Sequence, residues 1–521
     1  MGLDFGYHWD EKLQFGLVQD SLESGILLPG WYKYPSITYW FSFLGTLPHA
    51  VLTWPQVGGN WQALVAHLIN VTKTDAYLLQ VRTIFLLVSA LSLVWVYLQP
   101  LTWGRSWLEG LVAAAALGFS WEVAYHARWI APDSVLMQFG ALTILCATLA
   151  IRQPQHRFWL YGSALAAGLA CSTKYPGGLL VVPALIAAYT VQSVKEQTLR
   201  VSDEAKEGEA TPQFQALIIR GFHKTIRFLN ASFPVVLIFG AAYLAATPGT
   251  LLEPIHFYKS ITYELSHYST GLSEQIITPG LPHLGLMLNY LAQVLFSHFR
   301  PAAWLIFSLA ALGAFALFKK DRSLFALLTI FPACYLLYFS TLAVMRARNL
   351  LVLAPFMALL SAHGAIYVWD KLPKAGLRRI WLALLTAVLI LNAGWLGYAA
   401  WSIQKRDPGR STAALIEYVS KYPGSHFWAS EKVWQQAYKQ PGETPNNFSP
   451  LPGGDDGYLV FYASEGMHNP NDWPSSRPGM ATRIFGPWEV NFDYYPRWAG
   501  EDRILVMPLD KAHQIGIQLV R

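Results

Sequence analysis

Long apolar runs separated by short polar segments dominate the chain. A helix needs about 20 mostly apolar residues to cross the hydrocarbon core of a bilayer. Ten runs reach or approach that length: 78–98, 107–125, 133–151, 158–175, 177–194, 228–246, 301–318, 324–341, 350–369 and 380–401. The pattern predicts an all-α polytopic membrane protein with about ten transmembrane helices.

Two further apolar stretches, 36–54 and 283–299, are interrupted by proline, histidine or amide side chains. Such interrupted stretches are typical of helices that lie in the plane of the membrane interface. We therefore expect two interfacial helical segments besides the transmembrane helices.

Composition supports a membrane protein and excludes a nucleic-acid partner. Of 521 residues, 53% are hydrophobic and only 13% are charged, against roughly 25% charged in soluble domains. The net charge of +6 comes from Lys and Arg spread between apolar runs, as the positive-inside rule requires. The three cysteines lie within apolar runs, so no disulfide framework is expected.

The basic loops orient the chain. Clusters at 319–322 and 371–379, together with the loop around Arg152, favour the cytoplasm, which also receives the long polar loop 195–227. Both termini then lie outside. We expect a membrane domain over 1–401 and a small external α/β domain over 402–521, in which "YLVFYA" and "RILVMPL" have the composition of strands.

The opening stretch "FGYHWDEKLQF" is then expected to be an external, charged and aromatic loop. Residues 1–35 contain no basic region followed by an apolar run that could carry them across the membrane. Either one more helix precedes residue 1, or a short N-terminus is translocated with the helix behind it; we favour the preceding helix.

Ionisable residues gather at the external ends of the predicted helices. The cations are Arg82, Arg128, Lys174, Arg346 and Arg348, and the acids on the same side are Asp10, Glu11, Glu122 and Asp133. Ionisable groups at membrane depth indicate a functional site. The alternative is that each cation extends to the headgroups, and that Asp10 and Glu11 belong to a solvated loop.

This arrangement suits one chemistry well. A lipid-linked sugar phosphate presents its phosphate at headgroup level, where cations can stabilise the charge that develops on the leaving group. A carboxylate opposite can accept the proton of an incoming hydroxyl. Polyprenyl phosphate is itself a good leaving group, so no general acid is required.

Several segments resemble the C-type (GT-C) membrane glycosyltransferases, in the branch of protein O-mannosyltransferases and the lipid A aminoarabinose transferase. "YHWDEKLQFGLVQDSLESGILLPGWYKYPSITYW" is similar to the first external loop of that family, and "YHARWIAPDSVLMQFGAL" to the second. "GLACSTKYPGGLLVVPAL" resembles a glycine-rich hairpin with a lysine at its tip. Further segments resemble later external parts: "TPGTLLEPIHFYKSITYELSHYSTG", "MRARNLLVLAPFMALL" and "DPGRSTAALIEYV".

The resemblance implies roles for individual residues. Asp10 matches the catalytic acid that acts as base, and Glu11 would position the acceptor or Asp10. Asp133 matches a second external acid, for which three roles stay open: structural, acceptor-binding or, in some relatives, metal-binding. Cations expected to bind the donor phosphate are Lys174, Arg128, Arg346, Arg348 and Lys33. The WWDYG-type signature of the oligosaccharyltransferase branch is not found, which makes transfer of a whole oligosaccharide less favoured. The family also implies a helix before the first external loop.

We therefore predict an inverting glycosyltransferase that moves a monosaccharide from a polyprenyl-phosphate donor to an acceptor hydroxyl on the external face of a prokaryotic plasma membrane. Its partners are the donor, membrane lipids and an acceptor that stays open: protein, lipid or glycan. No metal is predicted, because His8, His126 and His267 form no compact zinc signature, although a divalent ion stays an alternative. The rival functions are a non-catalytic assembly subunit with the same fold and a secondary transporter.

Overall fold

The computed structural model describes residues 9–204, 213–271, 277–344, 346–404, 408–438, 445–451, 456–462, 483–485, 490–492, 495–497 and 504–514. Two compact units are distinguished, His8–Leu396 and Gly397–Arg521. The helices up to the end of the membrane part are α1 Trp9–Ser24, α2 Ile37–Leu44, α3 Leu47–Thr53, α4 Trp61–Thr72, α5 Asp75–Thr102, α6 Trp107–Gly118, α7 Trp121–His126, α8 Pro132–Arg152, α9 Arg157–Cys171, η2 Tyr175–Leu180, α10 Val181–Glu204, α11 Gln213–Ala246, α12 Gly249–Leu252, α13 Pro254–Thr270, α14 Leu281–Gln293, α15 Arg300–Lys320, α16 Arg322–Ser340, η3 Ala347–Leu353, α17 Ala354–Lys371 and α18 Ala375–Gln404.

Eight helical segments of the described residues are long and apolar enough to cross a membrane: Asp75–Thr102, Pro132–Arg152, Tyr175–Ser193, Phe228–Ala246, Arg300–Lys320, Arg322–Ser340, Ala347–Lys371 and Ala375–Trp401. The polytopic helical fold class is thus confirmed, and the chain is a multi-pass membrane protein. The other two expected spans are shorter in the structure. The run 107–125 is divided, because α6 ends at Gly118 and the Ser120 side chain caps the next helix, α7. The run 158–175 corresponds to α9, which has only 15 residues.

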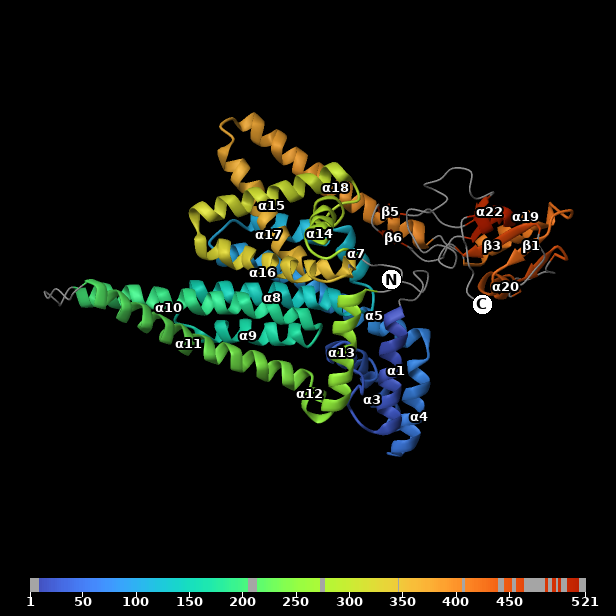
Figure 1. The fold of residues 1–521 in the computed structure, drawn as a ribbon, viewed down its shortest axis with the longest axis horizontal. Helices are drawn as coiled ribbons and strands as arrows, with labels where there is room; N and C mark the ends of the chain where they lie inside the picture. The colour runs from blue at the N-terminus through green and yellow to red at the C-terminus, as the bar shows by residue number, and fades with distance from the viewer. Residues whose placement is uncertain are drawn as a thin grey trace. The chain divides into compact units, whose positions relative to one another are not determined.

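The centre of the membrane unit is built on α8 and α17. The most apolar windows of these two segments are 83% buried, whereas that of α18 is only 6% buried. Helix α8 packs against α5, α9, α10 and η3, while α17 packs against α15 and α6. Figure 1 shows α8 to α11 running side by side. Since the α18 surface has so little protein cover, its apolar side chains are left to the lipid.

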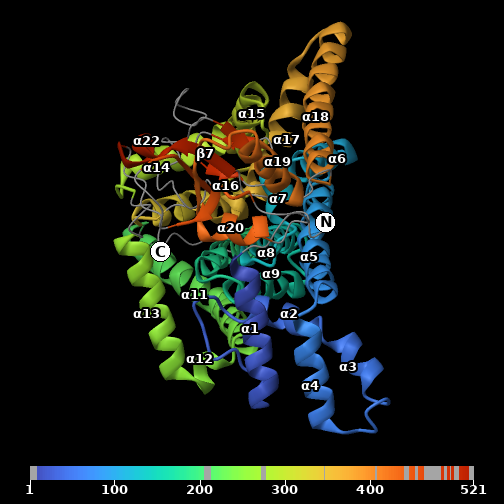
Figure 2. The same ribbon diagram turned by 90° about the vertical axis from the view of Figure 1, so that its right-hand side faces the viewer.

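The described part of the expected opening loop, from Trp9 on, is helical. Helix α1 begins at Trp9, and Asp10 and Glu11 lie in its first turn. Carboxylates at this place stabilise a helix because they face the positive end of its macrodipole, which explains why two adjacent acids start a helix here. Helix α1 packs beside α4 (Figure 2), with Leu17, Val18 and Leu64 in their shared core.

The two interrupted apolar stretches form short helices, α2 and α3 in the first stretch and α14 in the second. The polar segment 195–227 differs from the expected loop. Its described residues are helical, since α10 continues to Glu204 and α11 already begins at Gln213. Glu, Gln, Lys and Leu are common in this segment, and these residues have high helix propensity.

The smaller unit is a compact α/β structure. Its five-stranded sheet has the order β2-β1-β3-β7-β4, and a second sheet pairs β5 with β6. The elements are α19 Pro408–Ser420, β1 Phe427–Ala429, α20 Glu431–Tyr438, β2 Phe448–Pro450, β3 Tyr458–Tyr462, β4 Arg483–Phe485, β5 Val490–Phe492, β6 Tyr495–Arg497, β7 Ile504–Pro508 and α22 Leu509–Gln514.

Both strands predicted from sequence are present and neighbours. β3 and β7 pair antiparallel, with Val460 opposite Val506, and these two side chains are fully buried. β1 runs parallel to both β2 and β3. Helices α19 and α20 supply Leu415, Val419 and Val433 to one core of the sheet. The small C-terminal α/β structure is therefore confirmed.

Candidate active site

Four segments that are far apart in sequence bring charged side chains together in the membrane unit. Arg348 Nη1 donates a hydrogen bond to Asp10 Oδ2 at 2.6 Å, and Arg348 Nε lies 3.4 Å from Asp133 Oδ2. Lys174 Nζ donates to Asp133 Oδ1 at 2.7 Å and to Asn349 Oδ1 at 2.6 Å. We call these five residues the Arg348 cluster. All five are buried.

The local sequence explains how each acid is presented. Asp133 follows Pro132 at the start of α8, where the fixed φ of proline suits the first helical turn. Asp10 also lies in a first helical turn. Lys174 is extended and precedes the 3-10 helix η2, so its side chain leaves the turn between α9 and η2. Arg348 comes from the first turn of η3.

The cluster is balanced in charge, with two cations facing two carboxylates. Burial raises the pKa of the Asp10 carboxyl, and the Arg348 guanidinium opposes that rise only in part. Burial disfavours the charged Lys174 amine, but the Asp133 carboxylate and Tyr268 together outweigh it, so the pKa of Lys174 lies above its ordinary value. A buried charge persists only when it is paired in this way.

Glu11 belongs to a neighbouring set of contacts. Arg82 donates to both Glu11 oxygens, at 2.8 and 2.7 Å, and the Ile130 backbone N–H donates to Oε1 at 3.3 Å. This bidentate pair connects α1 to α5 and to the segment before α8. Glu11 therefore holds the start of α1, and with it Asp10, in place.

Two of the predicted phosphate-binding cations, Arg128 and Arg346, are not among the residues of the Arg348 cluster. The Arg128 guanidinium lies 4.6 Å from the ring centroid of Tyr125 and 5.0 Å from that of Trp129, so it faces aromatic rings. Arg346 is partly buried and lies near His267, as Lys33 does. The pKa of His267 is lowered by burial and by nearby Arg346 and Lys33.

A cavity of about 220 Å³ adjoins the Arg348 cluster. Lys174 belongs to both the cluster and the cavity wall, and Tyr34, which also lines the cavity, accepts a hydrogen bond from Arg348 Nη2 at 3.4 Å. Lys33 is the second cation of the wall, and its ammonium lies 3.4 Å from the centroid of the Tyr263 ring. The remaining lining residues are Tyr175, Pro176, Ile261, Glu264, Leu265, Tyr268, Tyr338, Phe339 and Leu342.

Among the described residues, no group of three or more His, Cys, Asp or Glu side chains could hold a metal ion. His126 pairs with Glu122 at 3.4 Å, and His267 stacks on Tyr263. His8 lies outside the described residues. The three cysteines are free.

Two residues of the site were not singled out from sequence: Asn349 and Glu264. Asn349 follows Arg348 directly, so adjacency to a predicted cation was an available signal. Glu264 had no such signal in the sequence, because an acid in an amphipathic helix is usually a solvated side chain. Its place in the cavity wall depends on how α13 packs.

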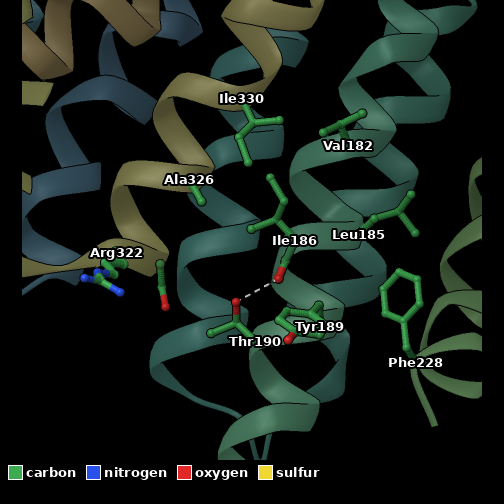
Figure 3. Close-up of a pocket in the computed structure, with 10 residues that line it drawn as sticks. Val182, Leu185, Ile186, Tyr189, Thr190, Phe228, Arg322, Ala326 and Ile330 are labelled. Atoms are coloured by element: carbon green, nitrogen blue, oxygen red, sulfur yellow. Dashed lines mark hydrogen bonds between the residues drawn. The ribbon is translucent and has the colours of Figure 1, made fainter. Parts of the chain in front are cut away.

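A second, larger groove lies away from these residues. It has a volume of about 720 Å³ and is formed by α10, α11 and α16, with Leu185, Ile186 and Phe228 among its lining residues. Figure 3 shows apolar side chains over most of it and Arg322 at one edge. None of the predicted site residues lines it.

Residues 55–203 match the sequence model of the family described as dolichyl-phosphate-mannose-protein mannosyltransferase. None of the curated protein sequences compared with the chain matches it significantly. Among solved structures, ArnT from Cupriavidus metallidurans bound to undecaprenyl phosphate is 12% identical at a TM-score of 0.42, covering 97% of this chain and 95% of ArnT. The oligosaccharyltransferase of Archaeoglobus fulgidus, in complex with zinc and sulfate, is 11% identical at a TM-score of 0.45, covering 98% of this chain and 74% of that chain.

Both structural likenesses have TM-scores below 0.5, so no shared site is inferred from them. The family match rests on sequence and includes the segment of Asp133 and Lys174. It confirms, for the segment matched, the resemblance that the sequence motifs indicate, namely to GT-C membrane glycosyltransferases of the protein-mannosyltransferase type.

Proposed function

We propose that this protein transfers a single sugar from a polyprenyl-phosphate donor to an acceptor hydroxyl, with inversion at the anomeric carbon. The observation that carries the proposal is the joining of Asp10, Asp133, Arg348 and Lys174 in one buried cluster beside a cavity. The donor class follows from the family match, whose description is a dolichyl-phosphate-mannose enzyme.

Asp10 is the general base in this proposal. Its pKa is raised by burial, which makes the carboxylate a stronger proton acceptor than an exposed aspartate. Positioned bases of this kind contribute about 10²–10⁴-fold to a rate. Arg348 donates to Oδ2 and keeps the carboxylate ionised and oriented, so Arg348 is a positioning residue rather than a free phosphate ligand.

Lys33 and Lys174 hold the donor phosphate. Lys174 is already shared between Asp133 and Asn349, whereas the Lys33 ammonium lies on an aromatic ring. Lys33 therefore brings a positive charge to the cavity. Among the described residues, no carboxylate lies within ion-pair distance of this ammonium. Because a phosphodiester adds negative charge to a site whose cluster is balanced, Lys33 is the cation that offsets it.

The reaction proceeds in one displacement. Asp10 takes the proton of the acceptor hydroxyl as its oxygen forms a bond to the anomeric carbon. The bond from that carbon to the phosphate oxygen breaks, and its electron pair remains on polyprenyl phosphate, where the lysines stabilise it. Attack opposite the leaving group inverts the anomeric carbon.

The position-based parts of the proposal follow from the basic loops. The site lies on the external face of the membrane, the membrane domain extends over 1–401 and the external domain over 402–521; a prokaryotic plasma membrane is the proposed location. The acceptor is a hydroxyl of a protein, lipid or glycan.

The test uses the purified protein in detergent and a panel of polyprenyl-phosphate sugars. Free polyprenyl phosphate, released by slow hydrolysis, is quantified without any acceptor. Wild type should cleave selected donors, and Asp10→Asn should lower the rate by about 10²-fold or more. Asp20→Asn is the matched control, because Asp20 lies on the same helix but is exposed.

Two results would contradict the proposal. Equal release by wild type and Asp10→Asn would remove Asp10 from catalysis. Binding of the donors without cleavage of any would favour a non-catalytic subunit with this fold.

A further inference from the structure

Helix α13 presents one face to the cavity beside the Arg348 cluster. Ile261, Glu264, Leu265 and Tyr268 all line that cavity, and their spacing of three, four and seven residues places them on one side of a helix. Three of these side chains are apolar or aromatic. Glu264 alone brings a charge to this face.

The Glu264 carboxylate has no structural partner that would explain it. It is partly buried, and the described residues provide it with no hydrogen bond or ion pair. A partly buried carboxylate on an otherwise uncharged helix face is costly unless something pairs with it. Burial accordingly raises the pKa of Glu264, although Lys174 and Lys33 act in the opposite direction.

Glu264 is within electrostatic range of both ends of the proposed reaction and shares the cavity wall with the two lysines. It interacts electrostatically with Lys174 and Lys33, where the phosphate is expected, and with Asp10, the expected base. In a direct displacement, the sugar ring must lie between the leaving phosphate and the base, because the anomeric carbon is bonded to one and attacked from the side of the other. A carboxylate in the wall of this cavity is therefore available to contact the sugar ring.

We propose that Glu264 accepts hydrogen bonds from the transferred sugar and so determines which donor is used. This inference rests on the proposed function. The sugar class is one with O–H or N–H donors near the carboxylate, a neutral hexose or pentose or an amino sugar. A uronic acid is excluded, because its carboxylate would face Glu264 in a partly desolvated site, where like charges repel.

The alternative is that Glu264 only balances the charge of Lys33 and Lys174. The two roles make different predictions. A charge-balancing acid alters affinity for every ligand with a phosphate by the same factor, whatever sugar it carries. A sugar contact alters the affinity for sugars unequally and leaves polyprenyl phosphate without a sugar unaffected or better bound.

The experiment compares wild type, Glu264→Gln and Glu264→Asp in detergent. Three donors are offered on one polyprenyl phosphate: a neutral hexose, a 4-amino sugar and a uronic acid, and KM and kcat are measured for donor cleavage. Binding of the sugar-free polyprenyl phosphate is measured separately. Asp20→Asn controls for the loss of one negative charge on an exposed residue, and the thermal midpoint of each variant checks folding.

We expect Glu264→Gln to raise KM for the preferred donor by about tenfold, the loss of one charged hydrogen bond, with a smaller change in kcat. Discrimination against the uronic acid should fall by a similar factor. Glu264→Asp keeps the carboxylate and should retain the order of preference. Asp20→Asn should match wild type.

The outcomes separate this inference from the proposed function. If wild type cleaves donors in an Asp10-dependent way but Glu264→Gln alters all donors and the sugar-free lipid equally, Glu264 only balances charge and the inference fails. Unchanged KM values overturn it as well, as does a variant that cleaves donors normally and loses only transfer to an acceptor. Wild-type protein that cleaves no donor overturns the proposed function and this inference together.

Discussion

Arg348 and Asp10 lie 338 positions apart in the chain and meet at 2.6 Å between the guanidinium Nη1 and Oδ2. The same guanidinium reaches Asp133 through Nε. One cation therefore connects the first turn of α1 to the first turn of α8. It also opposes the rise in the Asp10 pKa that burial causes.

This contact predicts the acid limb of the pH profile. Asp10 acts as a base only when ionised, and its raised pKa means that activity falls at a higher pH than for an exposed aspartate. Arg348→Gln removes the group that favours the ionised form, so the pKa of Asp10 should rise further. The acid limb of kcat/KM, measured for donor cleavage, should then move to higher pH.

Arg348→Lys keeps a positive charge near Asp10 and should shift the limb less than Arg348→Gln. Arg152→Gln removes an exposed cation of the pair with Asp321 and should leave the limb where wild type has it. An acid limb that is the same in wild type and Arg348→Gln would show that Asp10 is not the titrating base.

The position of Lys33 in the cavity wall predicts that its replacement weakens phosphate binding. Because its ammonium lies on the Tyr263 ring rather than against a carboxylate, Lys33→Gln should leave the Arg348 cluster intact. Loss of a charge-assisted contact should weaken binding of polyprenyl phosphate by about tenfold or more. Titration of the sugar-free lipid against each variant measures this directly.

Lys33→Arg retains the charge and should recover part of the affinity, while Lys12→Gln, an exposed lysine of α1, should bind like wild type. If Lys33→Gln binds the lipid as tightly as wild type, the phosphate does not contact Lys33, and Lys174 is its main cation.

The fold class followed from sequence because membrane-spanning helices are local: a run such as 324–341 carries its own signal, whatever packs against it. The two expected spans that proved short, 107–125 and 158–175, show where that signal fails. Ser120 caps a new helix inside the first run, and a count of apolar residues does not register such a break.

The site was partly predictable for a related reason. Asp133, Lys174 and Arg348 are conspicuous because charges are rare in apolar segments. Their partners could not be predicted, because which acid pairs with which cation depends on how distant helices pack. Arg128 and Arg348 look alike in sequence. Arg128 faces aromatic rings, whereas Arg348 joins two carboxylates.

The Glu11–Arg82 pair predicts a stability effect rather than a catalytic one. Both side chains are buried, at 0% and 2% exposure, with Nη2 and Oε2 at 2.7 Å. Glu11→Gln removes the carboxylate that pairs with the buried Arg82 guanidinium, and breaking a buried pair typically costs about 3–5 kcal/mol. The thermal midpoint in detergent should fall by several degrees.

The exposed pair of Arg152 and Asp321 is the matched control, since its side chains are 44% and 29% exposed. Arg152→Gln should cost about 0–1 kcal/mol and hardly move the midpoint. Equal midpoints for Glu11→Gln and wild type would mean that the pair does not hold α1 in place.

Gly364 predicts how closely α15 and α17 must approach. A Cβ added at Gly364 would meet the Leu309 carbonyl oxygen, and one added at Gly313 would meet that of Leu360, so each glycine lies against the backbone of the opposite helix. Small residues permit such close packing of membrane helices. Gly364→Ala must push α15 and α17 apart, and overpacking of this kind costs about 1–3 kcal/mol.

The measurement is again the thermal midpoint in detergent, which should fall for Gly364→Ala and fall further for the double variant Gly313→Ala, Gly364→Ala. Gly285→Ala in α14 is the control, because a Cβ there would have no heavy atom within 4 Å; it should match or exceed wild type, since alanine favours the helix by about 1 kcal/mol. If Gly364→Ala and Gly285→Ala behave alike, the two helices are not held at contact distance by their glycines, and the packing of α17 at the centre of the membrane unit must come from its larger side chains instead.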